Sequence, residues 1–157
     1  MITGKWITGG GDLSAALEIR KKVLEEQGAG PADQDALDSQ AMHVIMYDGE
    51  KPVATGRLYF EGTKLFMGCI CVLKEYRGQS IGDLMVRLMI FRGFEFAREI
   101  RLRAQREVQG FFERYGFAAQ GEPAPKGDRV HVLMVLEKQK AAFPSKCGEN
   151  CAQKLIN

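Results

Sequence analysis

The sequence predicts one α/β domain built on a mixed sheet, antiparallel in its first half. Three runs rich in β-branched and aromatic residues follow one another between turn signals. A long stretch with apolar residues at helical spacing follows, and then two further strand-like runs. A strand, helix, strand order implies a parallel crossover, which is right-handed in nearly all proteins.

Length, composition and charge limit the class of protein. The chain has 157 residues, 45% hydrophobic and 27% charged, which fits one globular domain with its own core. A formal net charge of +2 gives no reason to expect a nucleic acid or a membrane as partner. No segment is apolar for long enough to be a signal peptide or a membrane span, which predicts a cytoplasmic protein with four reduced cysteines.

The chain begins with a predicted helix and an acidic loop. Apolar spacing indicates a helix over about 13–27, with Asp12 as its N-cap and Gly28 at its end. Residues 28–40 carry Pro31 and several aspartates, which is typical of a loop, and we expect this loop to shape a substrate mouth.

An antiparallel meander is predicted next. Its strands cover residues 42–47, 53–59 and 64–72, and the pairs Asp48-Gly49 and Glu61-Gly62 mark the turns between them.

The second half of the chain returns to helical spacing. A stripe predicts a long helix from Ser80 to about residue 99, and it consists of Ile81, Leu84, Met85, Leu88, Phe91 and Phe94. Short strands are predicted over 100–103 and 130–136, with a helix over 106–115 between them that Gly116 ends. Residues 141–157 are expected to be an appended tail, so the domain covers 1–140.

The segment most informative about function joins the third strand of the meander to the long helix. Residues 72–82 read Val-Leu-Lys-Glu-Tyr-Arg-Gly-Gln-Ser-Ile-Gly. A helix N-terminus offers free backbone N–H groups and a favourable dipole to a pyrophosphate, and Gly78 and Gly82 let that backbone approach closely. The segment lacks the Gly-Lys-Ser/Thr of a Walker A loop and the glycine spacing of a dinucleotide site. The alternative is a tight connection that holds no ligand.

This turn resembles the signature of the GNAT superfamily of N-acetyltransferases. That signature is Arg or Gln, two residues, Gly, any residue, and Gly or Ala, and Arg77 and Gly82 match its ends. Ser80 stands at the middle glycine, where its hydroxyl could donate to a phosphate instead. Further motifs over residues 13–137 resemble the ElaA-like branch. They are Arg20-x-x-Val23-x-x-Glu26-Gln27, Asp35-x-x-Asp38, Ala41-x-His43, Gly56-Arg57-Leu58, Ala104-Gln105, Gly116-Phe117, and His131 with Met134.

The resemblance implies a fold, a co-substrate and a set of contacts. It implies a mixed sheet with flanking helices, splayed beside the third strand so that coenzyme A lies in the split. Acetyl-coenzyme A would be the co-substrate, no metal would be needed, and the acceptor would be a small-molecule or peptide amine. A homodimer is left open. The residues implied at the cofactor are Ile70, Cys71, Val72, Arg77, Gly78, Gln79, Ser80, Ile81, Gly82, Gln105 and Phe112.

Acetyl transfer to a primary amine needs a deprotonated nucleophile, a donor for the oxyanion and a way to release the thiolate. The resemblance implies a tyrosine acid at the position of Phe112, which cannot donate a proton. Tyr115, one helical turn onward, is the candidate acid, with ordinary packing as the alternative. His43 is a candidate base, and His131 could serve likewise. A hydrogen-bonded structural histidine is the alternative for both.

Charged residues outside the turn have two interpretations. Arg57 and the loop bearing Asp35 and Asp38 could bind a charged acceptor, or they could only solvate the fold.

The cysteines are expected to be packing residues or incidental thiols. Cys69 and Cys71 should point to one face of a strand because side chains alternate. Cys147 and Cys151 lie in the tail, and nothing places two cysteine pairs together for a zinc ion.

The sequence is also compatible with two other classes of function. A non-catalytic acyl-coenzyme-A-binding module is favoured by Phe112 and Ser80, which replace a tyrosine and a glycine of the family. A purely structural or interaction domain would use the cleft for no cofactor, and acyl thioesters would then not raise its thermal stability.

Overall fold

A computed structural model describes residues 1–28, 35–126 and 129–144 of the chain. Within these residues one mixed sheet has the strand order β1-β2-β3-β4-β5-β8-β6, with β7 also paired to β8. The strands are β1 (Ile2–Thr8), β2 (Met42–Asp48), β3 (Lys51–Glu61), β4 (Lys64–Val72), β5 (Glu99–Gln105), β6 (Ala118–Ala119), β7 (Ala124–Lys126) and β8 (Arg129–Glu137). The helices are α1 (Ser14–Glu26), α2 (Ile81–Gly93) and α3 (Gln109–Glu113), with short 3-10 turns η1 (Asp38–Gln40), η2 (Lys74–Tyr76), η3 (Arg106–Val108) and η4 (Lys138–Lys140).

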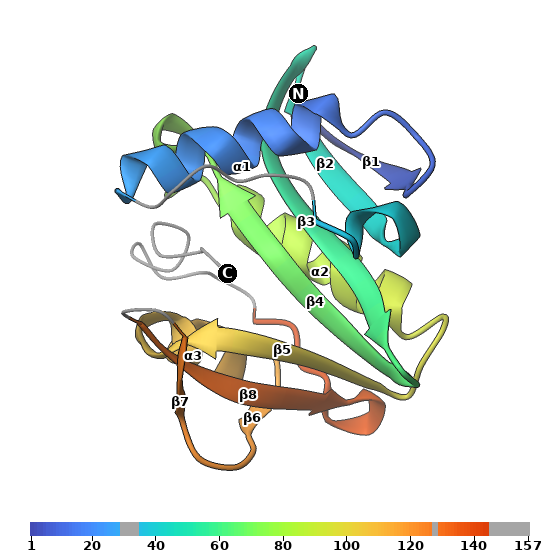
Figure 1. Cartoon of the computed structure of the whole chain (residues 1–157), viewed down its shortest axis with the longest axis vertical. Coiled ribbons are helices and arrows are strands. Elements are labelled where there is room, and N and C mark those ends of the chain that lie inside the picture. The colour runs from blue at the N-terminus through green and yellow to red at the C-terminus, as the bar shows by residue number, and fades with distance from the viewer. Residues whose placement is uncertain (29–34, 127–128, 145–157) are drawn as a thin grey trace.

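The sheet confirms the predicted fold class. Strands β1 to β4 pair in chain order and antiparallel, β5 lies parallel to β4, and β8 lies antiparallel to β5. Helix α2 connects the parallel pair, as the predicted crossover requires. Figure 1 shows α1 on one face of the sheet and α2 on the other, with β5, β8, β6 and β7 forming the second half.

Helix α1 covers one face of the sheet through a small apolar stripe. Ala16, Ile19 and Val23 are buried at helical spacing against Ile45 and Cys71. The helix begins one residue later than expected, because Leu13 occupies the cap position. The carboxylate of Asp12 nevertheless accepts a hydrogen bond from the Ser14 backbone N–H at 3.0 Å.

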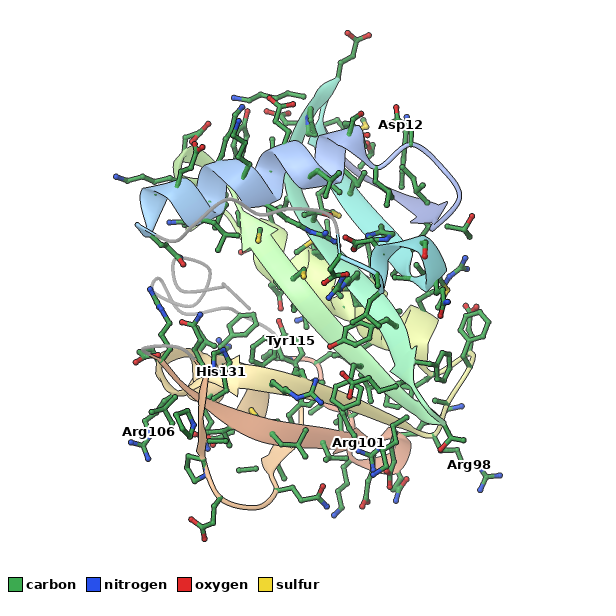
Figure 2. All side chains as sticks on the ribbon, viewed as in Figure 1. Asp12, Arg98, Arg101, Arg106, Tyr115 and His131 are labelled. Atoms are coloured by element: carbon green, nitrogen blue, oxygen red, sulfur yellow. The ribbon has the colours of Figure 1, made fainter. Side chains whose placement is uncertain are left out.

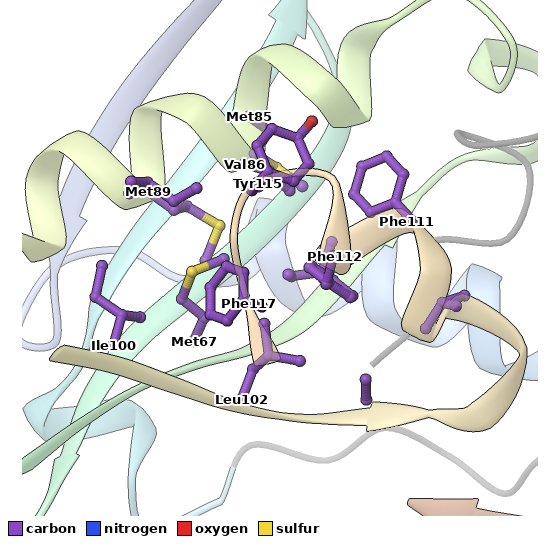
Figure 3. Packing of buried hydrophobic residues seen from close by; sticks show 14 of the residues in the cluster. Met67, Met85, Val86, Met89, Ile100, Leu102, Phe111, Phe112, Tyr115 and Phe117 are labelled. Atoms are coloured by element: carbon purple, nitrogen blue, oxygen red, sulfur yellow. The ribbon is translucent and has the colours of Figure 1, made fainter. Parts of the chain in front are cut away.

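The main core lies between the opposite face of the sheet and helices α2 and α3 (Figure 3). The buried residues of α2 are Ile81, Gly82, Met85, Val86, Met89, Ile90 and Gly93. Two positions of the predicted stripe are therefore wrong, since Leu84 is 40% exposed and Phe91 is 59% exposed. The helix is apolar around most of its circumference, so the sequence pattern does not single out the buried side.

Helix α2 also ends earlier than predicted, at Gly93 rather than near residue 99. The chain must turn there so that β5 can begin at Glu99, and the backbone N–H of Ala97 returns to the Gly93 carbonyl oxygen at 3.1 Å. A Cβ on Gly93 would lie 2.6 Å from Cδ1 of Ile100, so the helix end packs closely on the first residues of β5.

The described structure contains three strands, β1, β6 and β7, that the sequence did not predict. Strand β1 is only weakly apolar, and it becomes a strand by pairing along its whole length with β2. Strands β6 and β7 have two and three residues, too few for a periodic signal. The helix expected over 106–115 divides into η3 and α3. It ends at Glu113, two residues earlier than predicted, and Gly116, whose φ is +102°, lies in the turn that follows.

Some of the residues after β8 contact the rest of the domain. The backbone N–H of Ala142 donates to the Tyr115 carbonyl oxygen at 2.8 Å. Phe143 stacks on the exposed Phe91 with 4.9 Å between ring centroids. Residues 141–144 therefore pack across the outer side of α2, while Cys147 and Cys151 lie outside the described residues. None of the described helices has the length and apolar character needed to cross a membrane.

Candidate functional site

The parallel strands β4 and β5 are in contact at one end only. They pair where residues 65–67 of β4 face residues 100–102 of β5, and then they diverge, as Figure 1 shows. Strand β4 continues for five residues beyond Met67 to Val72. Along those residues the described part of the chain provides no partner on the β5 side, which leaves an open split in the sheet.

A bulge in β4 lies inside this split. Gly56 on β3 faces two residues of β4, Cys69 and Ile70, because the pairing register shifts there. Cys69 takes a left-handed φ of +50°, unusual for a residue with a side chain. Gly68 and Cys69 are half-buried in a strand interior that is otherwise buried. The bulge therefore exposes backbone at the point where β5 has moved away.

The bulge also changes the expected placement of the two strand cysteines. Strict alternation is interrupted at Cys69, so the argument for a shared face does not hold. Cys71 is buried beneath α1, and burial raises the pKa of its thiol to about 12. Cys69 is half-buried, and neither residue forms a disulfide.

The turn between β4 and α2 has the geometry of an anion site. Gly78 and Ser80 both adopt left-handed backbone, with φ of +78° and +63°. Serine thus tolerates the conformation for which the family signature uses glycine. The first bond into the helix runs from the Leu84 N–H to the Ser80 carbonyl oxygen at 3.0 Å. In the described structure the N–H groups of residues 78–83 have no such acceptor, so they remain available at the positive end of the helix dipole.

Arg77 fixes the shape of this turn with its side chain. Its Nε donates to the Val72 carbonyl oxygen at 3.0 Å, and its guanidinium forms an ion pair with Glu26 at 2.8 Å. Arg77 thereby joins the end of β4 to the end of α1. Gln79 also folds back, with Nε2 donating to the Glu75 carbonyl oxygen at 3.1 Å. The side chains of Arg77 and Gln79 organise the turn while its backbone stays open.

A pocket of about 510 Å³ borders the turn and the first residues of α2. Its lining includes Gln79 and Ser80 of the turn, Arg87 of α2, and Phe143. This volume falls within the range of small-molecule sites.

Phe112 in α3 and Tyr115 just after this helix, the two aromatic residues considered for the site, lie in the core. Phe112 is fully buried and packs edge-to-face on Phe111 and Phe117. Tyr115 is 1% exposed, and its hydroxyl donates to the carboxylate of Asp83 on α2. Figure 3 shows the Tyr115 hydroxyl pointing from the apolar cluster toward α2. The proton of Tyr115 is therefore already engaged, which favours the packing alternative.

We expect Tyr115→Phe to lower the free energy of unfolding by about 1 to 3 kcal/mol, because it removes a part-buried hydrogen bond to a carboxylate. Thiol release from acetyl-coenzyme A should stay within twofold of wild type. Urea unfolding and a thiol assay check the two parts. A large loss of turnover in a variant of unchanged stability would instead identify Tyr115 as the acid.

His43 belongs to a buried charged network. It is fully buried on β2, with Nε2 3.0 Å from the Asp38 carbonyl oxygen and Nδ1 3.3 Å from NH2 of Arg20. Arg20 can only donate, so Nδ1 accepts and Nε2 carries the proton. Burial lowers the pKa of His43, and the positive charge of Arg20 adds to this effect. A neutral histidine with hydrogen bonds at both ring nitrogens has no free lone pair with which to accept a proton from an amine. The geometry therefore favours a structural role for His43 over a role as catalytic base.

The same network contains the charged residues expected at the substrate mouth. Asp38, fully buried on η1, accepts from NH1 of Arg20 at 2.9 Å and from NH1 of Arg57 at 2.8 Å. Arg57 also contacts both oxygens of Asp35, at 2.7 and 3.0 Å. Burial opposes ionisation of Asp38, but the hydrogen bonds and charges of the two arginines outweigh it and lower its pKa to about 2.

Arg57 and Asp38 therefore neither face a charged acceptor nor solvate the surface, since both residues are buried and pair with each other. Asp35 differs, because half of its side chain is exposed. The network fastens the described end of the acidic loop to β3, next to the bulge of β4.

Gln105 and His131 lie at the open end of the split. They face each other across the β5 and β8 pair, and both are half-buried. The side-chain oxygen of Gln105 accepts from Arg129 at 2.9 Å. Figure 2 places His131 toward the end where the strands diverge and Arg101 nearer the end where they meet. In the described residues no group of three or more His, Cys, Asp or Glu side chains is arranged to hold a metal ion.

Comparison with known proteins agrees with this geometry. The profile of the acetyltransferase (GNAT) domain matches residues 39–119. A Bacillus subtilis protein whose name proposes an acetyltransferase is 33% identical over 146 residues, which are 87% of this chain and 97% of that protein. The chain therefore belongs to the GNAT acetyltransferase family, as the sequence motifs indicated.

Solved structures show the same fold. Escherichia coli ElaA has a TM-score of 0.79 at 21% identity, over 87% of this chain and 100% of that one. An acyl-CoA N-acyltransferase from Pseudomonas aeruginosa has a TM-score of 0.77 at 24% identity, over 87% and 99%. A GNAT acetyltransferase from Elizabethkingia anophelis, solved with acetyl-CoA bound, has a TM-score of 0.66 at 16% identity, over 87% and 97%.

Proposed function

We propose that the protein transfers an acetyl group from acetyl-coenzyme A to a primary amine, by direct attack of the amine on the thioester. Two features at one end of β4 support the proposal. The strand edge is unpaired beyond Met67, and the following turn presents N–H groups without an acceptor in the described structure. An extended pantetheine can pair with such an edge, and a pyrophosphate suits such a turn.

The residues present fit this ligand. The turn from Gly78 to Gly82 would hold the pyrophosphate through backbone N–H groups at the N-terminus of α2. Backbone at Ile70 and Cys71 would face the pantetheine, because these residues lie in the unpaired part of β4. The carbonyl oxygen of Val72 already accepts from Arg77, so we assign Val72 and the Arg77 side chain to supporting the turn.

The chemistry proposed for the site relies on position more than on a strong base. A backbone N–H of the β4 bulge would donate a hydrogen bond to the oxyanion that forms when the amine attacks the thioester. Stabilising this negative charge is usually the largest single contribution to catalysis of acyl transfer. We propose structural roles for His43 and Tyr115, whose hydrogen-bonding groups are engaged inside the fold. The amine would then lose its proton to water or to a group of the acceptor.

The proposal is tested by following thiol release from acetyl-coenzyme A with small amines, amino acids, peptides and protein lysines as acceptors. We expect at least one amine class to accelerate release, with mass spectrometry finding one added acetyl group on that amine. Calorimetry should find binding of acetyl-coenzyme A by the same preparation. Binding without amine-stimulated release would contradict catalysis and favour the acyl-coenzyme-A-binding module.

A further inference from the structure

Release of the thiolate benefits from a proton donor, and the tyrosines differ in their ability to supply one. Phe112 has no hydroxyl, and the hydroxyls of Tyr115 and Tyr76 donate to carboxylates. Tyr47 lies on β2, two strands away from β4, with a lysine over its ring. The chain has four tyrosines, so Tyr59 on β3 is the remaining one. Its hydroxyl is a hydrogen-bond partner of Arg103, and because arginine can only donate, that contact does not use the phenol proton.

Tyr59 lies where the split closes. A Cβ placed on Gly68 would come within 3.3 Å of Tyr59 Cε1 and 3.6 Å of its hydroxyl oxygen. The edge of the phenol ring therefore occupies the space beside Gly68. Gly68 is the first residue of β4 beyond the last pair with β5, and it directly precedes the bulge. The phenol group thus borders the backbone at which we expect the acyl group.

Two guanidinium groups flank this phenol. Cζ of Arg57 lies 4.8 Å from the centroid of the Tyr59 ring. On the other side, Phe66 stacks on Tyr59 with 5.7 Å between centroids, and Cζ of Arg103 lies 4.3 Å from the Phe66 centroid. The four planar groups come from three adjacent strands, β3, β4 and β5, and they form one row on the α1 side of the sheet.

The charges in this row suit a proton donor. Burial raises the pKa of Tyr59, the positive charges of Arg103 and Arg57 oppose the rise, and Glu61 and Cys69 add to it. The phenol therefore keeps its proton at neutral pH. A phenolate formed for a short time would be stabilised by the two guanidinium groups.

We propose that Tyr59 donates the proton that the departing thiolate of coenzyme A takes up, an assignment that rests on the proposed acetyl transfer. The amine nitrogen forms a bond to the acyl carbon, and the carbon–sulfur bond breaks with its electron pair on sulfur. The phenol proton moves to that sulfur and produces the thiol. The new ammonium of the acceptor then loses a proton, which returns to the Tyr59 oxygen through solvent.

Fluorine NMR of protein labelled with fluorotyrosine tests the placement without catalysis. Each resonance is assigned by its loss in the corresponding Tyr→Phe variant. Coenzyme A should shift the Tyr59 resonance, and desulfo-coenzyme A, which lacks the sulfur, should shift it clearly less. The Tyr47 resonance should not move with either ligand. Equal Tyr59 shifts with both ligands, or none, would overturn the assignment.

Tyr59→Phe tests the chemical role and keeps the stacked ring. We expect kcat for thiol release from acetyl-coenzyme A, with water or the best amine as acceptor, to fall about tenfold or more. The dissociation constant for coenzyme A should stay within about twofold, and Tyr47→Phe should match wild type. An unchanged kcat in Tyr59→Phe, or a loss explained by weaker binding, would overturn the assignment while leaving acetyl transfer intact. A wild-type protein that neither binds coenzyme A nor releases thiol would overturn both.

Discussion

Asp38→Asn should lower the free energy of unfolding by about 3 to 5 kcal/mol, because it leaves two buried arginines without their shared carboxylate. Arg20 and Arg57 are each about 95% buried, and both contact Asp38 within 3.0 Å. Asparagine has almost the same volume as aspartate, so the loss measures the charge rather than a cavity. The substitution should also loosen the attachment of η1 to the sheet, since Asp38 lies in that turn.

Urea unfolding of Asp38→Asn and Glu18→Gln provides the comparison. Glu18 forms an exposed ion pair with Lys22 at 3.2 Å, so its amide variant should change stability by less than 1 kcal/mol. The two variants should also differ in acid. The folded pKa of Asp38 is about 2 and its ordinary value is 3.8, so its contribution is complete above about pH 4 and is lost as the pH falls toward 2. Asp38→Asn should lack that part of the acid dependence, and a loss of less than 1 kcal/mol at neutral pH would contradict the network.

The antiparallel part of the fold could be predicted because its signals are local. Strands β2, β3 and β4 alternate with turns at Gly49 and Gly62, whose φ values are +62° and +61°. The anion-binding turn was recognisable for the same reason, since a strand end, two glycines and a helix start are adjacent in sequence. Strand β1 could not be predicted, because pairing with β2 rather than its own pattern makes it a strand.

The charged network could not be predicted, because its members come from four elements. Arg20 lies on α1, Asp38 on η1, His43 on β2 and Arg57 on β3, and only the tertiary fold brings them together. Their presence in motifs of the ElaA-like branch was a signal, but it did not reveal that the residues share hydrogen bonds.

Partners of individual side chains were also hidden in the sequence. Glu26 pairs with Arg77, and Asp83 accepts from Tyr115, each across more than 30 positions of the chain. Tyr59 was overlooked for a related reason: it reads as an ordinary aromatic residue of a strand. Its place at the closed end of the split depends on where β5 stops pairing with β4.

Gly82→Val should weaken binding of acetyl-coenzyme A by at least tenfold, which corresponds to about 1.4 kcal/mol. Gly82 lies in the first turn of α2, two residues after the left-handed Ser80, and it is buried. A β-branched side chain there would stand between the pyrophosphate and the N–H groups of the turn. Acetyl-pantetheine, which lacks the pyrophosphate, should be much less sensitive to the change.

The control for Gly82→Val is Gly10→Val, because Gly10 has open space around its Cβ position and lies in the segment between β1 and α1. Thermal unfolding must first establish that both variants are folded, since valine at a helix start can also strain the backbone.

Calorimetric titration of folded Gly82→Val with acetyl-coenzyme A tests the central claim most directly. The structure predicts a dissociation constant at least tenfold above that of wild type, with Gly10→Val unchanged. Wild-type affinity in Gly82→Val would mean that this turn does not hold the pyrophosphate, and the proposed acetyl transfer would lose its main physical support.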